Sequence, residues 1–183
     1  METEVKIPLS DRSAIEQCLT SFGFHISVPR RFESNDLYDT ADHSLRRQSM
    51  LLRLRRVADK SVVTWKGPGV AGPHKSRPEL ETTLGSADTL AEILKQLGYQ
   101  RTFRYEKYRT EYQKGQQHSV VTLDETPIGD FMEIEGEPGW IDATAGQLGF
   151  SQDDYILESY GSLYLEHCKK LGMQPGDMVF ASH

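Results

Sequence analysis

Charged residues occupy every second position in five short segments of this chain. The segments are Glu2, Glu4 and Lys6; Arg53 and Arg55; Arg77, Glu79 and Glu81; Lys107 and Arg109; and Glu133 and Glu135. Because side chains alternate between the two faces of a β-strand, each segment places its charges on one face. Most of the intervening residues are apolar or aromatic, so each segment predicts a strand with one charged face and one buried face.

Two architectures are compatible with this pattern. A half-buried sheet with one solvated, charged face explains any single segment. Five recurrences that carry both signs of charge favour a sheet that packs its apolar side under helices and closes around a polar lumen. Such a lumen suits a polyanion together with a divalent metal.

The remaining patterns order the chain into strands and helices. Strands are predicted at residues 2–9, 36–39, 50–57, 61–66, 77–84, 103–113, 118–124 and 129–135, and helical segments at 11–22, 42–48, 87–97, 142–148 and 158–171. Ser10 and Ser86 are the expected N-caps of two helices. Residues 67–76, with three glycines and two prolines, predict a loop that is able to act as a flexible lid. Residues 173–183 are expected to form a loose tail behind a single domain of residues 1–172.

The chain contains an internal pseudo-repeat. Glu2-Thr3-Glu4 precedes a helix that ends in Phe22-Gly23-Phe24, and Glu79-Leu80-Glu81 precedes a helix that ends in Leu97-Gly98-Tyr99. Two such halves, each with strands that present charge to the same side, predict an α+β fold. The fold is a closed or nearly closed antiparallel barrel with helices packed outside.

Composition excludes several classes of function. The 183 residues suit one domain or two closely packed halves. The formal net charge of -6 argues against a general nucleic-acid binder, so an anionic ligand needs a local cluster of cations. The sequence has no run of about 18 apolar residues and is charged near its N-terminus, which predicts neither a membrane span nor a signal peptide. We expect a cytoplasmic protein in which Cys18 and Cys168 are buried thiols.

The charged residues fall into two chemical groups. Oxygen ligands that suit Mg²⁺ or Mn²⁺ are offered by Glu2, Glu4, Asp124, Glu133 and Glu135. Cations that bind phosphate oxygens are offered by Lys6, Arg53, Arg55, Lys66, Lys107 and Arg109. Internal salt bridges between the two groups are the alternative explanation.

Other catalytic signatures do not hold. No histidine pair has zinc-ligand spacing, and residues 69–76 resemble a P-loop only superficially. His74 replaces the second glycine of that motif, Pro73 lacks an amide donor, and a strand rather than a helix follows.

The ordered set of motifs resembles the CYTH domain, the triphosphate tunnel metalloenzymes, over nearly the whole chain. The similar segments are Glu2-Thr3-Glu4-Val5-Lys6, Leu37-Tyr38-Asp39-Thr40, Leu52-Arg53-Leu54-Arg55, Thr64-Trp65-Lys66, Arg77-Pro78-Glu79-Leu80-Glu81, Lys107-Tyr108-Arg109, Leu123-Asp124-Glu125 and residues 129–135. This resemblance implies an eight-stranded antiparallel tunnel with a triphosphate at its centre. The five carboxylates above would hold one or two divalent ions, and the six cations would bind the triphosphate. Glu4, Lys66 and Glu135 are the expected catalytic residues, whereas the roles of Glu79 and Glu81 stay open.

The resemblance covers more than one activity. A triphosphatase directs water at the terminal phosphate, and a class IV adenylate cyclase directs the ribose 3′-hydroxyl of ATP at the α-phosphate and releases pyrophosphate. We expect a triphosphatase acting on inorganic, thiamine or nucleoside triphosphate, with the cyclase and a non-catalytic triphosphate-binding protein as alternatives. Phe32, Tyr38, Tyr105 and Tyr160 are candidates to stack on a base, although each fits a core position. A homodimer stays open.

Overall fold

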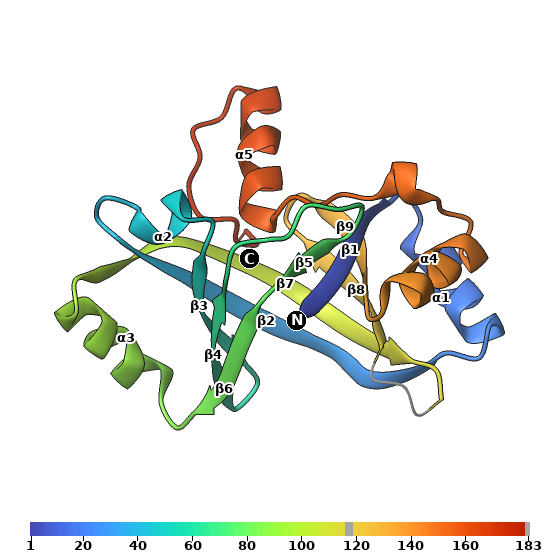
Figure 1. The fold of residues 1–183 in the computed structure, drawn as a ribbon, viewed down its shortest axis with the longest axis horizontal. Coiled ribbons are helices and arrows are strands. Elements are labelled where there is room, and N and C mark those ends of the chain that lie inside the picture. Colours follow the sequence, from blue (N-terminus) through green and yellow to red (C-terminus); the bar gives the residue numbers. More distant parts are fainter. Residues whose placement is uncertain (116–118, 182–183) are drawn as a thin grey trace. The chain divides into compact units, whose positions relative to one another are not determined.

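The structure is a computed structural model that describes residues 1–115 and 119–181 (Figure 1). Its elements are β1 (Glu2–Leu9), α1 (Arg12–Ser21), β2 (His25–Thr40), α2 (Ser44–Arg47), β3 (Leu51–Val57), β4 (Lys60–Lys66), β5 (Lys75–Arg77), β6 (Glu79–Leu84), α3 (Ala87–Gln96), β7 (Tyr99–Gln113), β8 (Val120–Thr126), β9 (Gly129–Glu135), α4 (Pro138–Gln147), a 3₁₀ turn (Gln152–Asp154) and α5 (Tyr160–Leu171). None of the described helices is long and apolar enough to cross a membrane.

The chain forms two compact units. The first unit comprises Met1–Arg31, Val70–Ser76 and Tyr108–Leu157, and the second comprises Phe32–Gly69, Arg77–Lys107 and Glu158–His183. The long strands β2 and β7 each begin in one unit and end in the other. Each unit is described below by itself.

In the first unit, β1, β9, β8 and the end of β7 pair in that order, and every pair is antiparallel. One face of this sheet is apolar and packs against α1 and α4. Val5, Val121 and Ile134 on the strands and Leu19 and Ile141 on the helices are fully buried there. This confirms that Val5 and Ile134, which stand between charged residues, point to the core.

In the second unit, the end of β2 is followed by β3, β4 and β6, again in antiparallel pairs. Tyr38 and Leu54 form a smaller core with Ala87 and Leu94 of α3. Leu80 of β6 was expected to be buried, but it is 68% exposed. The reason is that β6 pairs only with β4 among the described strands, and α3 packs on β3 instead.

The pseudo-repeat is confirmed, with a shift in its register. Asp11 caps α1 and Ser86 caps α3, and Gly23 and Gly98 follow the two helices with φ of 84° and 88°, a conformation that favours glycine. Glu4 stands as many residues before the N-cap Asp11 as Glu79 stands before the N-cap Ser86, so Glu79 corresponds to Glu4 rather than to Glu2. The two short charged motifs alone suggested the wrong alignment.

Several element boundaries differ from the prediction. Strand β2 runs over His25–Thr40 instead of 36–39, because Pro29 and the consecutive polar residues 33–36 interrupt the apolar alternation that marks a strand. Helix α1 takes Asp11, not Ser10, as its N-cap, since the Asp11 carboxylate accepts from the Ala14 N–H at 3.1 Å. Helix α4 begins at Pro138, a favoured first helical residue, instead of 142.

The strand inventory also changes, although the antiparallel α+β architecture is confirmed. Residues 75–84 form two strands, β5 and β6, because Pro78 has no N–H to continue the ladder. The described residues therefore contain nine strands rather than eight. Residue 118, the expected start of one strand, lies outside the described residues, and closure of the sheet into a tunnel stays a prediction.

The expected loose tail is wrong for residues 173–181. Met178 is 1% exposed, and its backbone pairs with β7 in a parallel bridge at Tyr105. The Met178 N–H donates to the Arg104 carbonyl, and the Glu106 N–H donates to the Met178 carbonyl, both at 2.9 Å. These backbone bonds fix the segment without any periodic sequence signal.

Candidate functional site

The charged faces predicted from the alternation are buried, not solvated. Lys6 and Lys107 are only 3% and 2% exposed, and Glu4, Lys66 and Asp124 are also buried. Removing lysines and carboxylates from water is costly unless they are paired or bind a ligand. The interpretation of a half-buried sheet with a solvated face is therefore wrong for these strands.

The first unit places its carboxylates on the sheet face opposite the apolar core. In the register of β1 and β9, Glu4 stands directly opposite Glu135, and Lys6 stands opposite Glu133. Glu2 lies two residues before Glu4 and is half-buried on the same face. The Lys6 ammonium lies 3.1 Å from the Glu133 carboxylate.

Arg109 joins the remaining carboxylates of this face. It stands opposite Asp124 in the register of β7 and β8 and forms two hydrogen bonds of 2.6 Å with that carboxylate. It also donates to Glu133. The guanidinium thus makes the fork-shaped contact that arginine uses with carboxylates. Arg109 was predicted to bind phosphate, but in this structure it holds two of the predicted metal ligands.

The electrostatics of this cluster keep Lys6 charged. Burial lowers the pKa of Lys6, but the nearby carboxylates of Glu133 and Glu4 outweigh burial, and the pKa lies above its ordinary value. Lys6 therefore stays a cation that can contact an anionic ligand.

The donor set fits a hard divalent cation. The Lys75 ammonium lies 2.6 Å from the Glu4 carboxylate, so this carboxylate already supports a positive charge. Among the described residues, no three Asp, Glu, His or Cys side chains are gathered closely enough to hold a metal by themselves. Mg²⁺ is usually held by only one or two carboxylates and is completed by water and phosphate oxygens, and the facing pair Glu4 and Glu135 fits that mode.

The second unit gathers four of the predicted cations. Arg53 and Arg55 lie on β3, Lys66 on β4 and Lys107 on β7. The side chains of all four are largely buried. Arg53 lies 3.6 Å from Glu81. Arg55 lies 3.8 Å from Glu33, and Lys107 lies 4.0 Å from the same carboxylate. These distances are longer than those between Arg109 and Asp124.

Two shorter contacts complete this face. The Lys66 ammonium lies 2.8 Å from Glu79. The hydroxyl of Thr64 donates to Glu81 at 2.8 Å and accepts from Arg53 at 3.1 Å. Glu79 and Glu81, whose roles the sequence left open, thus neutralise cations of the second unit. The predicted salt-bridge alternative is correct to this extent.

Tyr105 contacts the cationic face through its hydroxyl. Its hydroxyl lies 3.4 Å from the Arg53 guanidinium. Burial raises the pKa of Tyr105, but the charges of Arg53 and Lys107 more than offset that effect, and the pKa is lowered. Tyr105 and Tyr160 form a ring contact in the core of the unit, so neither acts as an open surface for a base.

The sequence reading missed three residues of these faces. Glu33 and Asn35 precede the strand that was predicted at 36–39, and Lys75 lies in the predicted loop. Asn35 is fully buried and stands opposite Arg55 in the β2 and β3 register, and within residues 1–115 and 119–181 neither atom of its amide has a hydrogen-bond partner. Extending the alternation of residues 37 and 39 backwards by two positions would have identified Asn35 and Glu33.

Comparison with known proteins agrees with this geometry. The family model of the CYTH domain matches residues 1–157. Adenylate cyclase CyaB from Aeromonas hydrophila is 31% identical over 134 residues, which span 73% of this chain and 67% of that protein. A protein from Methanocaldococcus jannaschii, provisionally named an adenylate cyclase, is 26% identical over 135 residues, or 74% of this chain and 76% of its own.

Solved structures share the fold. A provisionally named adenylate cyclase from Vibrio parahaemolyticus has a TM-score of 0.78 at 22% identity, covering 88% of this chain and 96% of its own. A provisionally named adenylyl cyclase from Hippeastrum, with a dominant triphosphatase activity, has a TM-score of 0.63 at 18% identity, covering 96% and 98%. Together with the match over residues 1–157, the buried charged faces lead to one conclusion: the chain belongs to the CYTH domain family, whose members are enzymes.

Proposed function

We propose that this protein is a divalent-metal-dependent triphosphatase. The observation that carries the proposal is the buried cationic face of the second unit, where the side chains of Arg53, Arg55, Lys66 and Lys107 are all at most 14% exposed. Buried cations are stable when anions complete their contacts. A triphosphate chain is an anion with enough oxygens for several cations at once.

The length of the ion pairs separates binding cations from structural ones. Arg55 contacts Glu81 at 3.3 Å and Glu33 at 3.8 Å, both longer than a good charge-assisted hydrogen bond. Arg109 instead holds Asp124 at 2.6 Å. Phosphate oxygens would displace these long contacts of Arg55 at little cost in free energy. The main role of Arg109 would be to orient carboxylates, and its contact with phosphate would be secondary.

The carboxylates of the first unit supply the metal chemistry. Glu4 and Glu135 would hold a divalent ion, with Glu2, Asp124 and Glu133 as the further oxygen donors that the family resemblance suggests. When bound, Mg²⁺ or Mn²⁺ offsets negative charge on the phosphates during phosphoryl transfer. Glu4 would release Lys75 as it takes up the ion.

The chain's own residues would carry the rest of the reaction. Lys66 and Arg53 stabilise negative charge on the phosphate oxygens as the bond to the leaving group breaks. A carboxylate of the Glu4 and Glu135 pair orients the attacking water. The Asn35 amide, which has no hydrogen-bond partner among the described residues, donates to a phosphate oxygen. No covalent intermediate with the protein is needed.

An assay with three substrates tests the proposal. The purified protein is incubated with Mg²⁺ or Mn²⁺ and, separately, inorganic triphosphate, thiamine triphosphate or ATP, and orthophosphate, pyrophosphate and cyclic AMP are measured. We expect orthophosphate that depends on the metal and disappears with a chelator. No product from any substrate would contradict the proposal and favour a non-catalytic binding role.

Adenylate cyclase activity is the second candidate. It is favoured by the two curated relatives, at 31% and 26% identity, whose names describe adenylate cyclases. Both reactions need the same metal and the same cationic face, and they differ in the nucleophile. Cyclic AMP formed in equal amount with pyrophosphate from ATP would establish this activity instead of hydrolysis.

A further inference from the structure

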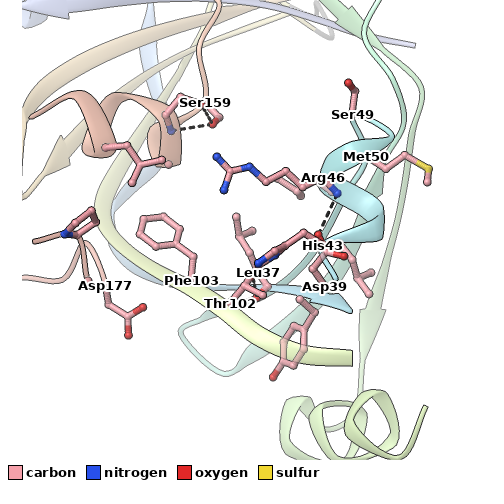
Figure 2. Close-up of a pocket in the computed structure, with 18 of the residues that line it drawn as sticks. Leu37, Asp39, His43, Arg46, Ser49, Met50, Thr102, Phe103, Ser159 and Asp177 are labelled. Carbon is pink, nitrogen blue, oxygen red and sulfur yellow. Dashed lines mark hydrogen bonds between the residues drawn. The ribbon is translucent and has the colours of Figure 1, made fainter. Parts of the chain in front are cut away.

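The second unit contains a cavity of about 630 Å³ between α2 and the start of α5 (Figure 2). Its walls carry both signs of charge, with Arg46 and Arg77 on the one hand and Asp39 and Asp177 on the other. Figure 2 shows the Arg46 guanidinium projecting into this space. Walls of mixed charge attract and repel an ionic ligand at once, so they favour no single class of ligand. In the first unit, by contrast, one short segment places a cation against a candidate metal ligand.

This segment, residues 70–76, carries Lys75 to the side of Glu4. The Val70 N–H donates to the Ser76 carbonyl at 2.7 Å, so the segment closes on itself as a narrow loop. Its last two residues begin β5, which is the neighbour of β1 in the sheet. The Lys75 ammonium lies 2.6 Å from the Glu4 carboxylate, and only 17% of the Lys75 side chain is exposed. Lys75 is therefore a largely buried partner of a candidate metal ligand.

Contacts on both sides of Lys75 in the sequence fix its position. Before it, His74 is 8% exposed, and its Nε2 atom lies 2.8 Å from the carboxylate of Asp142 on α4. After it, the hydroxyl of Ser76 lies 2.9 Å from the hydroxyl of Thr3 on β1. The segment is thus tied to α4 and to β1, and Lys75 is held in place by its neighbours as well as by its charge.

Lys75 and a divalent ion would compete for Glu4. An ammonium and a divalent ion on the same carboxylate lie close together and repel each other. The ammonium is attached to the chain, so its effective concentration at Glu4 is high, and a free metal ion has to displace it. A phosphate oxygen beside the metal would offer the displaced ammonium a new partner, since the four-carbon stem of lysine is flexible.

We propose that Lys75 is a tethered competitor of the divalent ion at Glu4, which makes binding of the metal depend on the triphosphate. The ammonium holds the Glu4 carboxylate in the absence of triphosphate and moves to a phosphate oxygen when metal and triphosphate bind. The affinities for the two ligands are thereby coupled, and each ligand raises the affinity for the other by the same factor. The proposal rests on the metal site of the proposed function. Lys75 itself lies outside every segment that resembles the family motifs.

Binding of Mn²⁺ alone, followed by calorimetry, is the first test. Lys75→Gln removes the competing charge. Lys114→Gln is the matched control, because it removes the charge of an exposed lysine in the same unit. We expect Mn²⁺ to bind about tenfold more tightly to Lys75→Gln than to the wild type, which is the effect of one hydrogen bond between charged groups. Lys114→Gln should bind Mn²⁺ as the wild type does, and the same result for Lys75→Gln would overturn the proposal.

His74→Leu distinguishes a tethered competitor from a charge that only repels the metal. This variant keeps the Lys75 charge but removes the contact with Asp142 that positions the segment, so we expect the affinity for Mn²⁺ to rise severalfold. It also keeps the proposal testable if thermal melts show that Lys75→Gln does not fold. Wild-type affinity for Mn²⁺ in a folded His74→Leu protein would show that the tether has no role, and the proposed competition would be wrong.

The preformed complex of Mn²⁺ with diimidotriphosphate, a triphosphate analogue that resists hydrolysis, tests the coupling. In this titration Lys75→Gln should lose its advantage over the wild type, because the wild-type ammonium gains a phosphate oxygen as its partner. An equal gain for free Mn²⁺ and for the complex would overturn the coupling.

The same variants separate this proposal from the proposed function. If Lys75→Gln gains affinity for Mn²⁺ but no protein releases orthophosphate from any triphosphate, the triphosphatase proposal falls and the competition at Glu4 stands. If the wild type releases orthophosphate and Lys75→Gln binds Mn²⁺ as the wild type does, only the role of Lys75 falls.

Discussion

The two units carry different charged residues on corresponding hairpins, β8 and β9 in the first unit and β3 and β4 in the second. In the first unit the second strand of the hairpin, β9, carries Glu133 and Glu135 on its buried charged face. The second strand of the other hairpin, β4, has the same seven-residue length and carries Thr64 and Lys66 at the matching positions. One scaffold therefore serves for carboxylates in one unit and for cations in the other. This division is what we expect if the first unit binds metal and the second binds phosphate.

Breaking the acidic side should have the largest effect. Glu4→Gln keeps the size of the side chain but removes the charge that supports a cation, so we expect metal-dependent turnover to fall by about a thousandfold. The control is Glu92→Gln, an exposed residue of α3. Binding of Mn²⁺ followed by calorimetry should weaken in Glu4→Gln alone. Wild-type turnover in Glu4→Gln would refute the metal role.

A second comparison concerns how much the ion pairs of each unit contribute to the stability of the protein. The buried Asp36 carboxylate binds Arg104 at 2.7 and 2.9 Å and Arg56 at 2.7 Å in the second unit. Asp36→Asn leaves these arginines without their counter-charge, and we expect a loss of about 3 kcal/mol in the free energy of unfolding, measured in urea at pH 7. Glu125→Gln breaks the more exposed contact with Arg30 in the first unit and should cost about 1 kcal/mol.

The direction of the Asp36 pKa shift predicts how the stability difference between the wild type and Asp36→Asn depends on pH. Burial raises the pKa of Asp36, but hydrogen bonds and charge from Arg104 and Arg56 outweigh it, and the pKa lies below its ordinary value. A lowered carboxyl pKa gives stability that is fully present above the unfolded pKa of about 4 and is lost as pH falls through the folded value. The gap between wild type and Asp36→Asn should therefore shrink between pH 5 and pH 2. A constant gap would mean that the Asp36 charge does not contribute.

Weakening the cationic side should affect binding more than turnover. Arg55→Ala removes a guanidinium that lies 3.3 Å from Glu81 and 3.8 Å from Glu33 and that we propose contacts phosphate oxygens. We expect KM for the triphosphate to rise roughly thirtyfold while kcat changes by less than about threefold, because two other cations remain on β3 and β4. Steady-state kinetics at saturating Mg²⁺ checks this split. A fall in kcat with an unchanged KM would move Arg55 from binding to the chemical step.

The sequence predicted these two faces but not everything that completes them. Alternation marks residues such as Lys6 and Arg55 because strand geometry translates spacing directly into facing. It failed in the middle of β2, where the consecutive polar residues 33–36 have no alternation, and so Glu33 and Asn35 were missed. The segment around Met178 was also missed, since it is fixed by backbone bonds to β7 that have no periodic sequence signal.

The smallest expected effect concerns Asn35, whose closest comparison is Thr110 at the end of β7. Both side chains are buried, and no residue in the described part of the chain forms a hydrogen bond with the polar side-chain atoms of either. Asn35 shares the cationic face with Arg55, whereas Thr110 stands opposite Leu123 of the first unit's apolar core. Replacing either by an apolar residue of similar branching should remove the cost of an unsatisfied buried polar group.

Asn35→Leu and Thr110→Val should therefore both stabilise the protein, by about 1 kcal/mol or roughly 3 °C in Tm. Only Asn35→Leu should raise KM for the triphosphate, because only its amide lies on a face that binds phosphate. A thermal melt and a KM measurement on the same two variants check both halves. If Asn35→Leu lowered Tm and left KM unchanged, the amide would be a structural group of the fold. A gain in stability combined with a loss of affinity would support a role of the Asn35 amide in binding the triphosphate.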